Sequence, residues 1–151
     1  MKTVDSKTDK DLVALMEKAA NFHGHLGPYL VIGVRIGQIA KRILNTNPRK
    51  ISTLQATAKV PLLTPFSCVL DGIQVTTHCT IGNQKLRIEK SQEGITVYFE
   101  LQNSDKALKV SVNPKIIGML TNKISEGVSN KELAWEIVHM PESQLFMIEN
   151  R

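Results

Sequence analysis

Apolar residues recur every three or four positions in two stretches near the start of the chain, a spacing that predicts amphipathic helices. The first helix is expected to open at a capping box of Thr8 and Asp11 and to reach His23. The second is expected to begin at Pro28, which suits the first turn of a helix, and to run to about Leu44. The apolar positions of the first stretch are Leu12, Leu15, Met16 and Ala19.

Two glycines share one face of the second predicted helix. Gly33 and Gly37 stand one helical turn apart, and each costs roughly 1 kcal/mol relative to alanine inside a helix. A glycine is useful there when another part of the chain comes close to the helix backbone. We therefore expect close packing against this face.

Strand patterns dominate the middle of the chain. Residues 53–60, TLQATAKV, alternate imperfectly between apolar and polar and predict a strand. Residues 85–89, 95–102 and 107–112 predict three more strands, joined by short polar turns that favour antiparallel neighbours. Residues 144–149, QLFMIE, are expected to form a final strand.

Further helices are expected between and after these strands. A short one starts near Pro65, another opens at Pro114, and the last follows a capping box of Ser129 and Glu132. The sequence has no repeat, low-complexity segment or linker, so residues 1–151 are expected to form a single domain. We predict the α+β class, with helices packed on a largely antiparallel β-sheet.

Composition and charge narrow the function. Hydrophobic residues make up 42% of the chain and charged residues 22%, as in ordinary globular proteins. The net charge is +5, but the only tight basic groups are Lys41–Arg42 and Arg49–Lys50, and aromatic residues are 5%, so we expect no nucleic-acid partner. The longest apolar run, Tyr29 to Val34, is far too short to span a membrane. The first residues lack the apolar stretch of a signal peptide, and a cytoplasmic location is expected.

Two histidines flank a glycine where the first predicted helix stops. His23 and His25 would point to nearly opposite sides if both were helical, and then they could not share a metal ion. Gly24 permits a left-handed backbone, and outside a helix the two side chains can converge. The pair can therefore serve as metal ligands only if the first helix ends before His25. Otherwise these residues are ordinary core or helix-end histidines.

The two cysteines provide the other candidate chemistry. Zinc binds imidazole nitrogen and thiolate sulfur together, so Cys68 and Cys79 could complete a site with the histidines. Alternatively, each is a small buried residue, as free cysteines often are. Cys68 lies in the first turn of its predicted helix, where the helix dipole favours the thiolate. Asp71, one turn later, could orient a ligand, carry a proton or simply lie on the helix surface.

Two segments resemble the signature segments of the formylmethanofuran dehydrogenase E-subunit family. They are FHGHLGPYLVIGVRIG, residues 22–37, and CVLDGIQVTTHCTIGN, residues 68–83. The resemblance implies an α+β domain, usually a homodimer, with a cleft between the motifs where a divalent metal such as zinc binds. Its signature positions fall on His23, His25, Cys68, Asp71 and Cys79, with Gln74, Thr80 and Gly82 in the second segment.

The sequence departs from this family pattern at two positions. Many relatives have cysteine where Gly27 stands, so one soft ligand is absent. Relatives commonly have glycine where His78 stands, so the loop is reshaped or His78 supplies a substitute ligand. No cysteine follows Cys79, so the chain corresponds to the core domain without the zinc ribbon of some relatives.

Four functions follow from these observations. The resemblance implies a metal-binding accessory protein linked to one-carbon and molybdenum-cofactor metabolism, including methanogenesis, with the dehydrogenase subunits as candidate partners. An independent metalloenzyme of the hydrolase type would use His23, His25, Cys68 and Cys79 as metal ligands and Asp71 as its proton carrier. A reactive Cys68 thiol without metal and a purely structural interaction module are the remaining alternatives.

Overall fold

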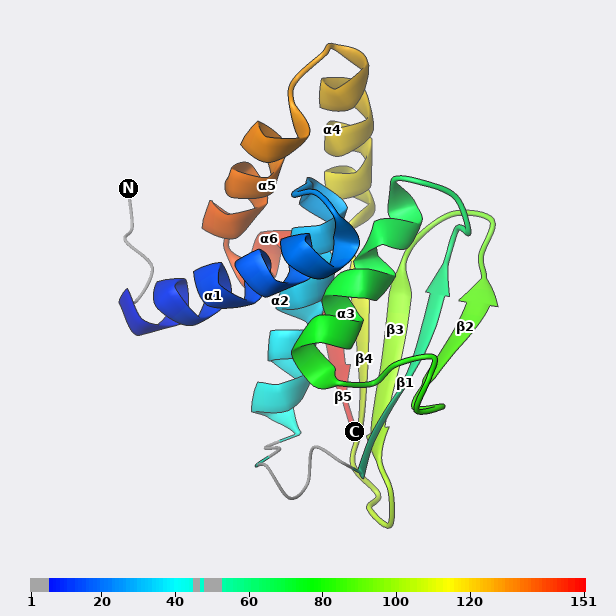
Figure 1. Cartoon of the computed structure of the whole chain (residues 1–151). Coiled ribbons are helices and arrows are strands. Elements are labelled where there is room, and N and C mark those ends of the chain that lie inside the picture. The colour runs from blue at the N-terminus through cyan, green and yellow to red at the C-terminus, as the bar shows by residue number, and fades with distance from the viewer. Residues whose placement is uncertain (1–5, 45–46, 48–52) are drawn as a thin grey trace.

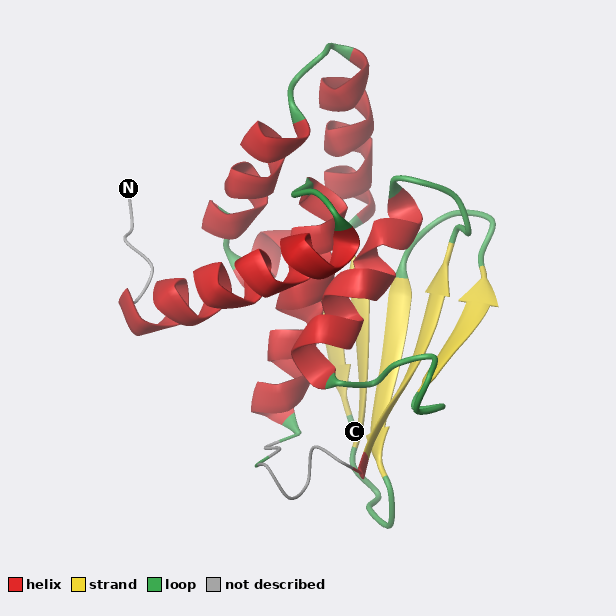
Figure 2. Cartoon of the chain, viewed as in Figure 1, coloured by secondary structure: helices red, strands yellow, loops and turns green. Residues whose placement is uncertain are grey.

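The computed structural model describes residues 6–44, 47 and 53–151 (Figure 1). The helices are α1 (Ser6–His23), α2 (Pro28–Ile43), the short 3-10 turn η2 (Phe66–Cys68), α3 (Val69–Thr77), α4 (Pro114–Ser125), α5 (Asn130–His139) and α6 (Glu142–Leu145). The strands are β1 (Leu54–Val60), β2 (Leu86–Lys90), β3 (Thr96–Leu101), β4 (Ala107–Val112) and β5 (Phe146–Asn150). These strands form one mixed sheet with the helices grouped to one side of it, which confirms the predicted single-domain α+β class (Figure 2).

The strand order β2-β1-β3-β4-β5 corrects one prediction. Strands β3 and β4 are antiparallel neighbours as expected, but β2 and β3 do not pair, because β1 lies between them. β1 runs parallel to β2 and antiparallel to β3. The segment that links β2 to β3 crosses the end of β1, where the Ser91 amide donates to the Val60 carbonyl oxygen. A short link therefore did not imply adjacent strands, since β1 gains hydrogen-bonded partners on both edges in this order.

The predicted helix boundaries hold with a few exceptions. Pro28 opens α2, and the Ser129 hydroxyl accepts a hydrogen bond from the Glu132 amide at the start of α5, as expected. The first helix already includes Thr8, so the capping box predicted there is wrong. The last strand is shorter than predicted, because α6 occupies its expected beginning. Of the basic groups, Arg49–Lys50 lies outside the described residues.

Helix α2 lies at the centre of the helical layer, and most of its residues are buried. Its contact with α3 is very close: a Cβ atom on Gly33 would lie 2.1 Å from the Val69 carbonyl oxygen, and one on Gly72 would lie 2.3 Å from the Leu30 carbonyl oxygen. A Cβ atom on Gly37 would come within 2.7 Å of the Thr76 side chain. The close approach predicted for the face of Gly33 and Gly37 is thus confirmed.

An arginine of α2 binds the carboxyl end of α5, which packs against α2. The Arg35 guanidinium donates to the carbonyl oxygens of Ile137 and Met140, at 2.9 and 2.5 Å, at the carboxyl end of α5. Burial lowers the pKa of Arg35, and the carbonyl oxygens compensate for part of its lost hydration.

Among the described helices, none is both long and apolar enough to cross a bilayer.

Gly33→Ala is expected to lower the free energy of unfolding by about 3 kcal/mol or more, because the added methyl group collides with the backbone of α3. Gly118→Ala is the matched control. Gly118 lies on α4 with open space around it, so alanine should stabilise the protein by about 0.5–1 kcal/mol through its better helix propensity. Chemical denaturation of the two variants measures both effects, and similar stabilities would contradict the close packing.

Candidate functional site

The histidine pair meets the condition set by the sequence. Helix α1 ends at His23, where the Gly24 amide donates to the Ala20 carbonyl oxygen and Gly24 adopts a left-handed φ of +103°. His25 therefore lies outside the helix, and the two imidazole rings come side by side with centroids 4.6 Å apart. The glycine makes this possible, since residues with a Cβ atom rarely adopt that backbone conformation.

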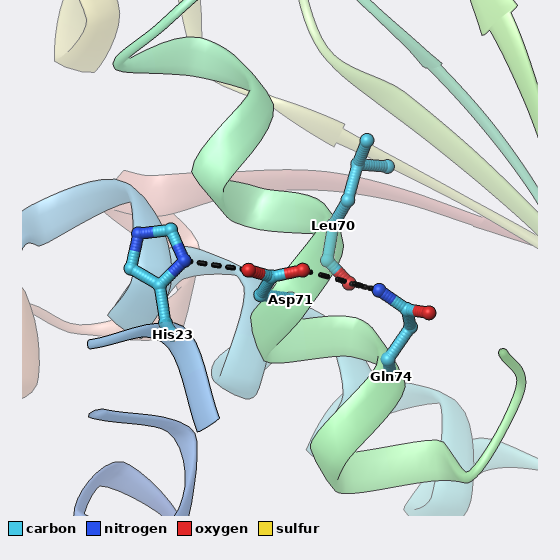
Figure 3. A network of polar contacts seen from close by, with 4 residues as sticks. All are labelled: His23, Leu70, Asp71 and Gln74. Atoms are coloured by element: carbon cyan, nitrogen blue, oxygen red, sulfur yellow. Dashed lines mark hydrogen bonds and ion pairs between the residues drawn. The ribbon is translucent and has the colours of Figure 1, made fainter. Parts of the chain in front are cut away.

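His23 is held by a carboxylate on α3 (Figure 3). Its Nδ1 atom lies 2.5 Å from Oδ2 of Asp71, while the Gln74 side-chain amide donates to Oδ1 of the same carboxylate at 3.2 Å. Because an ionised carboxylate can only accept, the contact places a proton on Nδ1, and in the tautomer that binds metal ions the Nε2 lone pair is then the free donor. Nε2 is buried and has no hydrogen-bond partner among the described residues.

Cys68 lies at the junction of η2 and α3, at the N-cap position of the helix. It is buried, and it lines the same cavity of about 450 Å³ as His23 and His25. Burial and, secondarily, the charge of Asp71 raise the pKa of the Cys68 thiol. The thiolate stabilisation expected from the helix dipole is therefore outweighed by desolvation and by a neighbouring carboxylate.

Cys79 lies away from these three side chains. It follows α3 at the end opposite Cys68, so the nine residues of the helix separate the two cysteines by roughly 13 Å. Its thiol is fully buried and donates to the Leu54 carbonyl oxygen at 3.2 Å, and burial raises the pKa of this thiol as well. The structure thus brings together three of the four predicted ligands, and the length of α3 keeps the fourth apart.

His78 is also at the far end of α3. It is exposed and ends the helix with a left-handed φ of 60°, the conformation in which glycine is most common. A glycine at position 78, the residue expected there in relatives, would adopt this backbone conformation without strain. The location of His78 beside Cys79 places it far from the cavity, so it is not a substitute for the cysteine that Gly27 replaces.

Two features of the site do not follow from the sequence pattern: the contacts of Gln74 and the place of Tyr29. The Oε1 atom of Gln74 accepts a hydrogen bond from the Ile81 amide at 3.3 Å, so Gln74 connects the Asp71 carboxylate to the loop after α3. Tyr29, in the first turn of α2, lines the cavity with a buried hydroxyl that has no partner among the described residues. A tyrosine within the apolar run of a predicted core helix was the only available signal.

The side chains as they stand do not form a complete metal-binding geometry. In the described ranges, no three His, Cys, Asp or Glu side chains are arranged to hold a metal ion. A larger open hollow of about 610 Å³ lies along the sheet, lined by residues such as Tyr98, Arg87 and Glu100. None of the signature residues lines it, so we place the candidate site at the smaller cavity.

Comparisons with known proteins identify the family. A family model described as FmdE, molybdenum formylmethanofuran dehydrogenase operon, matches residues 22–147, a range that includes both motifs. The chain belongs to the FmdE family. A crystal structure of a tungsten formylmethanofuran dehydrogenase FmdE-like protein from Syntrophus aciditrophicus has the same fold, with a TM-score of 0.61 and 20% identity. That match covers 93% of this chain and 71% of the other.

A relative from Archaeoglobus fulgidus is described as a probable S-adenosyl-L-methionine-binding protein. It is 26% identical over 166 aligned residues, which cover 96% of this chain and 44% of that protein. The chain therefore spans less than half the length of that relative.

In the metal-free protein, Cys68 is expected to react slowly with iodoacetamide near neutral pH, because its raised pKa leaves little thiolate. The rate should keep rising with pH beyond 9.0, the ordinary thiol value, instead of levelling off there. Asp71→Asn should accelerate the reaction by removing the nearby negative charge. Peptide mass spectrometry follows each thiol, with buried Cys79 as the protected internal control. A rate that levels off near neutral pH would indicate an activated thiol instead.

Proposed function

We propose that this FmdE-family chain is a metal-binding accessory protein that holds one divalent ion, preferably zinc, through His23, His25 and Cys68. The observation that carries the proposal is the Nε2 atom of His23, which is buried without a partner among the described residues while Nδ1 of the same ring contacts Asp71. An imidazole nitrogen in that state is able to bind a metal ion, and a second imidazole and a thiol line the same cavity.

The contact between His23 and Asp71 supports this assignment. Histidines that bind zinc commonly donate their other ring N–H to a carboxylate, which fixes the tautomer and the ring orientation. Both carboxylate oxygens of Asp71 already accept hydrogen bonds, one from His23 and one from Gln74. We therefore assign Asp71 an orienting role in preference to that of a proton carrier in a hydrolase.

The remaining donors can join His23 with modest adjustment. His25 is exposed, so a change of its side-chain rotamer displaces no core residue. Cys68 must release its proton on binding, and because its pKa is raised, metal affinity should increase with pH. Three protein ligands leave one position of a tetrahedral zinc ion open, where the metal would act as a Lewis acid toward a bound ligand.

The family description supports a link to formylmethanofuran dehydrogenase and hence to one-carbon and molybdenum-cofactor metabolism such as methanogenesis. We propose that the chain forms a homodimer and meets the dehydrogenase subunits in that setting. Light scattering of the purified protein, alone and mixed with those subunits, tests both associations.

Metal content per chain separates the three proposed ligands from Cys79. Protein purified without chelators should retain close to one equivalent of metal, measured by elemental analysis. Cys68→Ser should lose most of it, whereas Cys79→Ser should retain it, because serine can still donate to the Leu54 carbonyl oxygen. Circular dichroism confirms that both variants fold. Wild-type protein without metal, or equal loss in the two variants, would contradict the proposal.

Asp71→Asn distinguishes an orienting carboxylate from a ligand. Because the substitution keeps the shape of the side chain but removes its charge, metal affinity should fall about 10–100-fold while one equivalent still binds at saturating metal. Competition with a chelating dye measures the dissociation constant. A variant that cannot be saturated would make Asp71 a direct ligand.

A further inference from the structure

The cavity beside the histidines is larger than a metal ion needs. Its volume is about 450 Å³, within the range of pockets that hold small organic molecules. Much of its wall is apolar, formed by Pro28, Tyr29, Leu30, Pro65 and Ile124. No Lys, Arg, Asp or Glu is among the described residues that line it. Apart from the two histidines and the metal ion proposed above, nothing in the described part of this lining would pair with a charge. Away from that end, the cavity therefore favours an uncharged, largely apolar occupant, since burying an unpaired charge is costly.

Tyr29 lines this cavity and carries a phenolic hydroxyl. Its side chain is 1% exposed, and its ring packs edge-on against Phe66 with centroids 5.4 Å apart, so the hydroxyl is held in place. Burial raises the pKa of Tyr29 to about 12, which keeps the hydroxyl protonated and able to donate at physiological pH. Buried polar groups in folded proteins almost always have a partner, and this one has none among the described residues.

The unpartnered groups are concentrated at this place. In the described part of the chain, three buried side-chain polar atoms lack a hydrogen-bond partner, those of His23, Tyr29 and Thr76. Two of these residues, His23 and Tyr29, line the one cavity. Thr76 instead packs against Gly37 in the contact of α2 with α3. The coincidence of two unpartnered polar groups with an apolar hollow indicates a ligand site more than a packing defect.

We propose that this cavity binds a small uncharged carbonyl compound, such as an amide, ketone or ester, whose oxygen accepts a hydrogen bond from the Tyr29 hydroxyl. The apolar body of the ligand packs against the walls formed by Leu30, Pro65 and Ile124. The proposal rests on the proposed metal site in one respect, because the metal would close the end of the cavity at His23 and Cys68. Without the metal ion, anionic ligands such as phosphates find no Lys or Arg to pair with in the described lining.

Calorimetric titration with benzamide tests the proposal on the metal-loaded protein. Benzamide should bind, and Tyr29→Phe should weaken its affinity about tenfold, the loss of one hydrogen bond. The matched control is Tyr98→Phe, which removes a hydroxyl from an exposed residue on the sheet and should leave the affinity unchanged. S-adenosyl-L-methionine, which is charged and larger, should bind more weakly than benzamide, whereas benzoate reports on the open position of the proposed metal ion, because a carboxylate can bind there.

The melting temperature of the ligand-free variants provides a second readout. Tyr29→Phe removes only a hydroxyl without a partner among the described residues, so its melting temperature should be unchanged or higher. A lower melting temperature would show that the hydroxyl has a structural role and would overturn the proposal. The absence of benzamide binding, or equal binding to wild type and Tyr29→Phe, would overturn it too.

Metal content measured on the same preparations separates this proposal from the proposed function. If the protein retains metal but does not bind benzamide, the carbonyl site is contradicted and the metal site is not. Tyr29-dependent benzamide binding in a protein that never retains metal contradicts the metal site and supports the carbonyl site.

Discussion

The close contact of α2 with α3 determines the rest of the site. Gly33 and Gly72 let the two helix backbones approach so closely that a methyl group on either glycine would collide with a carbonyl oxygen of the other helix. The histidine motif directly precedes α2, and Cys68 and Asp71 lie at the start of α3. His23 ends α1, which itself packs against α3, so its ring lies within hydrogen-bond distance of a carboxylate 48 residues away. The two motifs form one site because α1 and α2 both pack on α3.

Helix α3 also divides the second motif into two parts with different roles. Its amino-terminal end presents Cys68 and Asp71 to the site, whereas its carboxyl-terminal end leads into the loop with His78 and Cys79. Cys79 donates to the Leu54 carbonyl oxygen at the start of β1, which attaches the loop to the sheet. A cysteine held in this way contributes to the fold, and it lies at the opposite end of α3 from the cavity that Cys68 lines. Family membership alone would not have separated the two cysteines.

Local chemistry made some of this predictable from the sequence. Gly24 indicated that the first helix could end between the histidines, and Gly33 indicated a close approach on α2; both follow from the missing Cβ atom. The position of β1 between β2 and β3 was not predictable, since short turns describe only the chain beside them. The pKa of Cys68 was predicted in the wrong direction, because the helix dipole is visible in the sequence while burial and the neighbouring Asp71 charge depend on tertiary packing.

Gln74 shows how the two ends of α3 depend on each other. Its side-chain NH₂ group donates to the Asp71 carboxylate, and its side-chain oxygen Oε1 accepts from the Ile81 amide in the loop. The loop is itself ordered by Asn83, whose side chain donates to the His78 carbonyl oxygen and accepts from the Thr80 amide. A carboxylate oriented only by one histidine would keep several rotamers, whereas one held from both sides keeps a single orientation. The loop thus contributes to the position of the His23 ring without touching it, which gives a physical reason for the second motif to extend beyond Cys68 and Asp71.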